Sequence, residues 1–261
     1  MRFVVGCMAG IDHALDSGRL ERLSKALHES RKEFEEVDFW PWLSEFEGKP
    51  ATKKAANKFI LAAIIDYQMN ADVIWKKSKR LTEKHWQDPE DLWQKVASYT
   101  HSEWMSMWRE YGLHRFPHAH ERVWRIGGEI LKKYGGDARN IWVEKGPIEV
   151  LRDLMELRMG PQISRMIVGA LLDTKQISGK TEMKHTCPKA DLNVCRVLGR
   201  SVFGLDEIDP TEATSITRKL DPEFPWELDL PLFSIGRSYC RKLKPMCDEC
   251  PLMSCCFYNQ M

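Results

Sequence analysis

Four cysteines near the carboxyl terminus constrain this chain more than any other feature of its sequence. They are Cys240, Cys247, Cys250 and Cys256, in the spacing C-x6-C-x2-C-x5-C. Thiolate sulfur is a soft ligand, and four sulfurs complete either a tetrahedral zinc site or a [4Fe-4S] cube. Structural zinc sites usually contain two short C-x2-4-C pairs, whereas only Cys247 and Cys250 form such a pair here. The spacing therefore favours a [4Fe-4S] cluster, with zinc as the alternative.

The composition is that of a globular chain. Hydrophobic residues make up 43% of its 261 residues, and no apolar run approaches the roughly 18 residues that a membrane span needs. Met1–Gly10 contains too short an apolar stretch for a secretory signal. We therefore expect a cytoplasmic protein with no membrane partner, and a reducing cytosol favours metal-bound cysteines over disulfide bonds.

Charge alone does not identify a partner. The formal net charge is +1, so no global basic field indicates nucleic acid. Any single cluster of basic residues is also explained as a solvated helix face. The clusters are Lys76, Lys77, Lys79 and Arg80; Lys132 and Lys133; and Arg237, Arg241, Lys242 and Lys244 beside the cysteines.

Apolar residues recur with helical spacing along almost the whole chain. Ile60, Leu61, Ile64 and Ile65 form one such set, and runs of alternating β-branched residues are nearly absent. The pattern predicts an all-α protein without repeats. Signals that end helices fall at Gly48–Pro50, Asp88–Pro89, Gly135–Gly136, Gly146–Pro147, Gly160–Pro161 and Asp209–Pro210.

Two segments carry candidate chemistry besides the cysteines. A predicted helix over 148–157 turns at Gly160 into a second helix that starts at Pro161. The free N–H groups of that start, with the helix dipole, suit a phosphate, although such a turn also serves simply as a turn. Asp191 heads a third predicted helix, over 191–200, at the N-cap position. Its carboxylate is either a plain cap or an ionised group that stabilises a cation or aligns a water.

In this order, the turn, the Asp-headed helix and the cysteines resemble the endonuclease III-like helix-hairpin-helix (HhH-GPD) DNA glycosylase superfamily. The cysteine spacing is similar to the family's iron–sulfur loop, and Ser234–Cys240 resembles its Gly-Arg-x-x-Cys lead-in. Asp191–Arg200 resembles V-D-T-H-V-x-R-V-x-x-R, the helix headed by the family's essential aspartate. Leu157–Ser164 takes the place of the hairpin L-P-G-V-G-x-K-T-A, and Leu61–Asp72 is similar to the L-x-S-x-Q-x-x-D helix.

The resemblance implies two helical lobes. One is a six-helix barrel at 57–174, with the helix-hairpin-helix at about 148–170. The other combines 1–56 with 175–261 and carries a [4Fe-4S] cluster loop at 240–256, with the four cysteines as ligands. The implied partner is double-stranded DNA with a damaged or mismatched base, bound by a monomeric, nucleoid-associated enzyme.

The resemblance also implies base excision. Such a protein flips one nucleotide out of the duplex and hydrolyses its N-glycosidic bond, and Asp191 would stabilise the positive charge that develops on the sugar. Gln68 would fill the gap that the base leaves. The implied DNA contacts are Gln68, Gly160, Pro161, Ile163, Arg237, Arg241, Lys242 and Lys244.

One departure from the family defines the expected chemistry. Aligning Gly160 with the second Gly of the hairpin motif places Gln162 at the position of the lysine that forms a Schiff base in bifunctional members. An amide cannot form that bond, so we expect a monofunctional glycosylase in which water is the nucleophile. The alternative is a bifunctional enzyme that uses another lysine, for which the candidates are Lys175, Lys180, Lys184 and Lys189. The stretch 173–190 is longer than in the family pattern and is our candidate for tuning the pocket.

Two other classes compete with a glycosylase. One is a non-catalytic helix-hairpin-helix DNA-binding protein that keeps the cluster. The other is a zinc nucleobase deaminase, because His101-Ser-Glu103 and Pro245-Met-Cys247-x-x-Cys250 imitate its H-x-E and P-C-x-x-C signature. Met246 interrupts the second motif, and the α/β alternation of a deaminase is missing.

Overall fold

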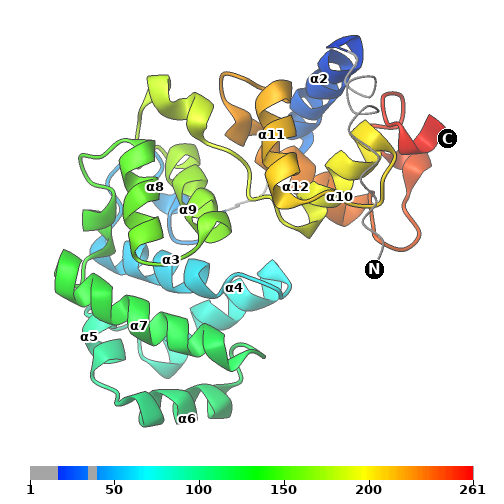
Figure 1. Cartoon of the computed structure of the whole chain (residues 1–261). Coiled ribbons are helices and arrows are strands. Elements are labelled where there is room, and N and C mark those ends of the chain that lie inside the picture. Colours follow the sequence, from blue (N-terminus) through cyan, green and yellow to red (C-terminus); the bar gives the residue numbers. More distant parts are fainter. Residues whose placement is uncertain (1–16, 35–39, 261) are drawn as a thin grey trace, which may run out of the picture. The chain divides into compact units, whose positions relative to one another are not determined.

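The computed structural model describes residues 17–34 and 40–260, and every regular element in them is helical (Figure 1). The predicted all-α class is therefore confirmed. Our expectation for Met1–Gly10 lies outside the described residues. No helix in the described ranges combines the length and the apolar character needed to cross a membrane.

The described residues divide into two compact units. One consists of 17–34 with 183–260, and the other of 40–182. The second unit contains the predicted barrel range, 57–174, and in addition 40–56 and 175–182, which the resemblance placed in the cluster lobe. Gln176 accounts for this difference, because its Oε1 accepts from Ala51 N at 2.9 Å and its Nε2 donates to Lys49 O at 2.7 Å.

The unit that carries the cysteines is built on α10 and α12. Gly236 lets these two helices pack closely, because a Cβ there would lie 2.6 Å from Asn193 Cβ. Leu23 and Leu27 of α2 complete a core that includes Leu252. Its elements are α2 (Ser17–Phe34), α10 (Leu192–Leu198), the π-helical turn η5 (Gly199–Phe203), α11 (Pro210–Leu220), η6 (Pro225–Leu228), α12 (Asp229–Ser238), η7 (Cys247–Glu249) and η8 (Tyr258–Gln260).

The other unit is organised around α3, whose residues from Phe59 to Ile65 are all fully buried. A helix that is apolar on every side lies at the centre of its unit. The elements are η1 (Ser44–Phe46), α3 (Lys53–Ile65), α4 (Ala71–Arg80), the π-helical η2 (Leu81–His85), α5 (Leu92–Ala97), α6 (His101–Tyr111), α7 (Pro117–Tyr134), η3 (Ala138–Ile141), α8 (Pro147–Glu156) and α9 (Pro161–Asp173). The short η4 (Lys180–His185) links the two units in sequence.

Helix boundaries follow the local signals in the sequence. Pro147, Pro161 and Pro210 each occupy the first position of a helix, and the start at Pro161 is as predicted. Glu103 forms a capping box with Thr100, whose backbone N–H it accepts at 2.8 Å. The deaminase-like His101-Ser-Glu103 is therefore explained as a helix start.

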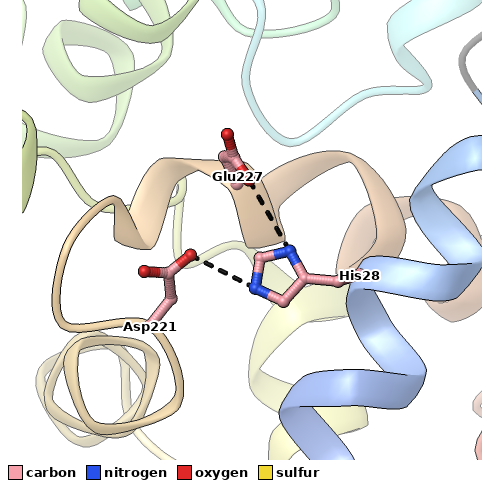
Figure 2. A group of neighbouring side chains, drawn as sticks. All are labelled: His28, Asp221 and Glu227. Atoms are coloured by element: carbon pink, nitrogen blue, oxygen red, sulfur yellow. Dashed lines mark ion pairs between the residues drawn. The ribbon is translucent and has the colours of Figure 1, made fainter.

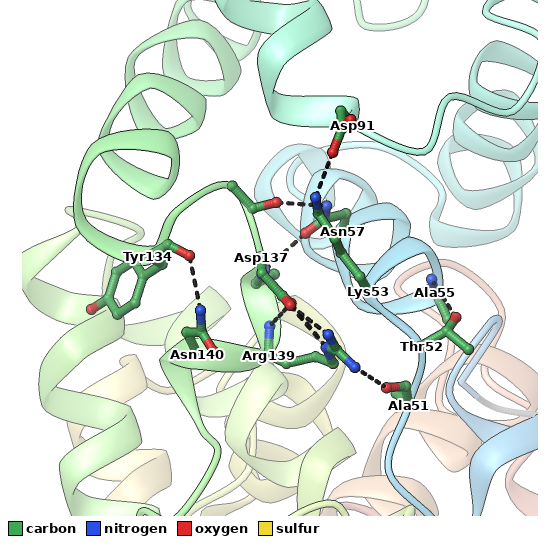
Figure 3. A network of polar contacts seen from close by, with 12 residues as sticks. Ala51, Thr52, Lys53, Ala55, Asn57, Asp91, Tyr134, Asp137, Arg139 and Asn140 are labelled. Carbon is green, nitrogen blue, oxygen red and sulfur yellow. Dashed lines mark hydrogen bonds and ion pairs between the residues drawn. The ribbon is translucent and has the colours of Figure 1, made fainter.

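Asn57 fixes α3 to the chain that follows α7. Its Nδ2 donates to Gly136 O at 2.9 Å, and its Oδ1 accepts from Ala138 N at 2.8 Å (Figure 3). The same oxygen accepts from Trp93 Nε1 at 2.9 Å. A fully buried amide needs all of these partners, because each unsatisfied polar group costs about 1–3 kcal/mol. This network holds the loop before α8 in place.

His120 makes the stability of its unit depend on pH. It is 4% exposed, stacks on Trp108 at 4.5 Å between ring centroids, and neither ring nitrogen has a partner among the described residues. Burial lowers the pKa of His120 from its ordinary value of 6.5 to about 4.

The unfolded chain binds this proton near pH 6.5 and the folded chain only near pH 4, so acid favours unfolding in that window. We expect the free energy of unfolding to fall by up to about 3 kcal/mol from this group between pH 7 and 4. His120→Phe keeps the stacked ring and removes the proton site. Chemical denaturation of both proteins across this range should show that the free energy of unfolding falls less with decreasing pH in the variant. An equal fall in both proteins would contradict this prediction.

Candidate active site and cysteine pocket

The four predicted ligands line one pocket. Cys240, Cys247, Cys250 and Cys256 are all free thiols, and they line one pocket. Cys255 is buried, does not line this pocket and donates from its Sγ to Leu252 O at 3.4 Å. Sequence spacing thus selected the four thiols that the fold brings together.

The distances between the thiols bear on which group they suit. Among the described residues, His28, Asp221 and Glu227 form the one group of three or more His, Cys, Asp or Glu whose ligand atoms all lie within 4.8 Å of one another. No three of the pocket thiols are therefore that close together. A tetrahedral zinc ion with Zn–S bonds of about 2.3 Å brings its sulfurs to about 3.8 Å. Sulfurs spread around a volume fit an iron–sulfur cube, in which each thiolate binds a different iron.

Burial keeps three of the four thiols protonated until a metal centre binds. It raises the pKa of the Cys250 thiol to about 11, and it also raises the pKa of Cys240 and of Cys256. A positively charged metal centre reverses this, because a coordinating thiol is deprotonated outright. The donor set and its pocket therefore fit the predicted cluster.

Two arginines of the Asp-headed helix hold the cysteine loop. Arg196 Nε donates to Cys240 O at 2.6 Å, and its Nη2 donates to Gly236 O at 2.8 Å. Arg200 Nη1 donates to Arg241 O at 2.8 Å and lies 3.7 Å from Cys240 Sγ. Both guanidinium groups are largely buried. The first predicted ligand is thus held by α10 and by η5, which follow Asp191.

Asp191 caps α10 as predicted. Its Oδ1 accepts from Asn193 N at 2.8 Å and from Val194 N at 3.1 Å. Oδ2 has no hydrogen-bond partner among the described residues, and the side chain is half-buried. One carboxylate oxygen therefore fixes the group, and the other remains available to a ligand.

The helix-hairpin-helix is formed by α8, a short turn and α9. Gly160 has φ of +82°, a conformation that suits glycine, and a Cβ there would meet nothing within 4 Å. Arg158 also has a positive φ, +58°. Aligning Gly160 with the second glycine of the motif places Arg158 at the first. Ile163 is 4% exposed, so only its backbone N–H can face a ligand.

Gln162, predicted at the position of the family lysine, is incompletely bonded. It lies in the first turn of α9, its Oε1 is buried, and this atom has no hydrogen-bond partner among the described residues. An unsatisfied buried amide oxygen costs about 1–3 kcal/mol. Such a group is positioned to bind a donor from a ligand or a water.

Two solved structures share the fold of this chain. Endonuclease III, trapped as a covalent intermediate with DNA in an estranged-adenine complex, has 18% identity and a TM-score of 0.65 over 92% of this chain and 97% of its own. A thermostable thymine-DNA glycosylase has 15% identity and a TM-score of 0.60 over 94% and 99%. The chain has the endonuclease III fold. No family model matches the sequence, and a search of curated proteins found no significant match.

Within this endonuclease III fold, Gln68 lies in a loop. The helical interpretation of Leu61–Asp72 is wrong, because α3 ends at Ile65 and α4 begins at Ala71. Gln68 is exposed with φ of +50°.

Two side chains from the loop after α6 hold the loop that carries Gln68. His114 Nε2 bonds Tyr67 O at 3.1 Å, and Arg115 Nη2 donates to Gln68 O at 2.8 Å. These carbonyls therefore bond side chains from the α6–α7 connection and do not continue the helix. The sequence offered no signal for this support.

Arg122 connects the Gln68 loop with the hairpin. Its Nη2 donates to Met159 O at 2.5 Å, and its guanidinium lies 5.2 Å from the centroid of the Tyr67 ring. Tyr67 also stacks on His114 at 4.9 Å. The two segments predicted to contact DNA in this unit are therefore held by one side chain, which the sequence analysis had not singled out.

The predicted basic contacts lie on or beside the cysteine loop, and all four side chains are exposed. Arg237 is in the last turn of α12, with its guanidinium 5.4 Å from the centroid of Phe233. Arg241 donates from Nε to Ser238 O at 3.1 Å. Lys242 and Lys244 follow on the exposed part of the loop.

Part of the longer stretch 173–190 packs on the start of the hairpin. Glu182 Oε2 accepts from Ile148 N at 3.2 Å, in the first turn of α8. Gly146 allows this approach, because a Cβ there would lie 2.5 Å from the same oxygen. The contact supplies a carboxylate to a helix N-terminus, and a role of the stretch in tuning the pocket stays a prediction.

His28 forms a second cluster of titratable side chains. Its Nε2 lies 3.2 Å from Asp221 Oδ2 and its Nδ1 lies 3.6 Å from Glu227 Oε2 (Figure 2). The carboxylates face different nitrogens of one ring, whereas a metal ion would need both of them beside one nitrogen. The arrangement is that of an imidazole paired at both nitrogens, which ties α2 to the end of α11 and to η6.

Proposed function

We propose that this protein is a DNA glycosylase of base-excision repair, which flips a damaged or mismatched base and hydrolyses its N-glycosidic bond. The observation that carries the proposal is Asp191, whose Oδ1 is fixed by two backbone N–H groups while Oδ2 has no described partner. The endonuclease III fold supports the same class of chemistry.

The proposed reaction separates the base from the sugar. The bond between C1′ and the base nitrogen breaks, its electron pair leaves with the base, and positive charge develops on the sugar. Asp191 Oδ2 stabilises this charge and orients a water, whose oxygen bonds to C1′. One proton of that water is released and the departing base takes up a proton.

The hairpin holds a phosphate in this proposal. The backbone N–H groups of Gln162 and Ile163 are in the first turn of α9, directly after Gly160, and they have no partner among the described residues. Such a helix start binds anions. Contacts of this kind position the duplex without reading its sequence.

The cofactor in this proposal is a [4Fe-4S] cluster held by Cys240, Cys247, Cys250 and Cys256. When bound, the cluster supplies four metal–thiolate bonds that fix the loop. Arg241, Lys242 and Lys244 are exposed on that loop and contact DNA phosphates, and Arg237 does so from the end of α12.

A panel of duplexes tests the proposal. Each duplex carries one altered base, chosen from uracil or thymine in mismatches, oxidised bases, adenine opposite a damaged base and alkylated purines. A glycosylase leaves an abasic site, which alkali converts into a strand break. Binding across the whole panel without any abasic product would contradict the proposal and favour the non-catalytic DNA-binding protein.

Gln162→Lys tests the monofunctional assignment. The wild-type protein should release the base without nicking the strand and without a product trapped by borohydride. The variant restores an amine at the family position and is expected to gain a trapped Schiff-base product on the duplex that the wild type processes. Gln162→Met has similar length without an amine and is the control. Trapping by the wild-type protein would instead support another lysine.

A further inference from the structure

Three cations on α4 have no charged partner in the part of the chain that the structure describes. Lys76, Lys79 and Arg80 lie at i, i+3 and i+4, so they share one face of the helix. All three are exposed, and no carboxylate pairs with any of them among the described residues. The face therefore presents three positive charges to solvent.

Some other lysines of the same unit are paired with acids. Lys53 Nζ lies 2.5 Å from Asp91, and Lys145 Nζ lies 2.6 Å from Asp153. Lys133 pairs with Glu129 at 3.2 Å. These pairs neutralise their lysines, whereas no described acid neutralises Lys76, Lys79 or Arg80.

The dipole of α4 does not account for these charges. Cations stabilise a helix end whose last carbonyls are free, but the backbone continues from Arg80 into η2. Leu81 N donates to the carbonyls of Lys77 and Ser78. Lys77, the remaining cation of this cluster, donates from Nζ to Gly112 O at 2.8 Å. Local structure thus uses Lys77 and leaves the other three available.

The position of α4 relates this face to Gln68. The helix starts at Ala71 and its N-cap is Asn70, two residues after the exposed Gln68. At a rise of 1.5 Å per residue, Lys76–Arg80 lie about 8–14 Å from the first turn of α4. Phosphates of one strand follow each other about every 3.4 Å along a duplex. The face therefore reaches at most about four base pairs beyond the start of α4.

We propose that Lys76, Lys79 and Arg80 bind phosphates of the DNA that flanks the target base on one side. The proposal rests on the proposed function for the place of Gln68 in the duplex, but it does not require base release. These contacts add affinity without sequence preference, as phosphate contacts generally do.

The test compares a triple variant, Lys76→Ala, Lys79→Ala and Arg80→Ala, with the full wild-type chain. The probe is a long duplex with a central tetrahydrofuran analogue of an abasic site, so that no particular base is needed. Losing three phosphate contacts should lower the slope of log affinity against log salt by about 2.7. Alanine favours helices, and thermal unfolding should confirm that the variant is folded.

The matched control removes three cations from an exposed helix in the other unit. Arg22→Ala, Lys25→Ala and Lys32→Ala on α2 make the same charge change. If the affinity loss arose from net charge alone, the slope of log affinity against log salt would fall equally in both triple variants. That result, or an unchanged slope in the α4 variant, would overturn the proposal.

Truncated duplexes locate the contact. Two further probes end directly beside the abasic analogue, one on its 5′ side and one on its 3′ side. The affinity difference between wild type and the α4 variant should vanish on one of them and persist on the other. A difference that persists on both would overturn the proposal. If the protein binds the duplexes in this way but releases no base from any of the panel, the glycosylase assignment is wrong and the α4 contact is still supported.

Discussion

Asp191→Asn is expected to lower single-turnover base release at least about 100-fold, because removing one preorganised electrostatic group commonly costs about 10²–10³ in rate. The duplex substrate is the one that the panel identifies. Asparagine is as good an N-cap as aspartate, so its Oδ1 can still accept from Asn193 N and Val194 N. Thermal stability and affinity for the abasic-analogue duplex should therefore stay close to those of the wild type.

The chain contains a matched control for this substitution. Asp209 heads α11 with the same geometry, accepting from Thr211 N at 2.7 Å and from Glu212 N at 3.1 Å. Asp209→Asn makes the same chemical change at another helix start of the same unit, and base release should be unaffected. If Asp191→Asn retains base release, or if both variants lose it equally, Asp191 does not carry the proposed charge stabilisation.

Cys247→Ala is expected to abolish the visible absorbance of the purified protein and to release the cluster loop. Wild-type protein should contain iron and acid-labile sulfide, about four of each per chain for a [4Fe-4S] cluster. Structural metal sites contribute on the order of 10 kcal/mol to folding, so losing one ligand should destabilise this unit by several kcal/mol. Faster amide exchange or proteolysis at 240–256 would report the released loop.

Cys255→Ala is the control for this loss. Cys255 is adjacent to Cys256 but lies in the core and not in the pocket lining. Its removal should cost about 1 kcal/mol of packing and leave the iron and sulfide content unchanged. One zinc per chain without sulfide would show instead that the four thiols hold a mononuclear site.

Signals carried within a few residues were readable from the sequence. Asp191 was predicted at the N-cap of its helix, and it is there because capping involves only the next three residues. The start at Pro161 was predicted from the absence of a proline N–H, and the helix expected from residue 148 begins one residue earlier, at Pro147. The cysteine spacing likewise defined the four thiols of one pocket, since all of them lie within one short loop.

Contacts between distant segments were not readable. Arg196 and Arg200 have a clear i, i+4 relation, but their partners, Cys240 O and Arg241 O, lie more than forty residues away. Similarly, the helix expected through Gln68 ends early because His114 and Arg115 bond carbonyls of the 67–68 loop. Helical periodicity carries no information about such side chains.

The basic clusters also combine a feature that the sequence shows with one that only the fold decides. The sequence showed Lys76, Lys79 and Arg80 beside Lys77 and could not distinguish a paired surface from an unpaired one. Only the folded chain decides this, because acids such as Asp91 and Asp153 pair with lysines that tertiary packing brings near them. The sequence by itself determined the all-α class, the helix starts, the four thiols and the capping aspartate, because backbone hydrogen bonds and ligand spacing act over short distances. Tertiary structure alone decided what holds the cysteine and Gln68 loops and which cations remain free, because those contacts join side chains far apart in the chain.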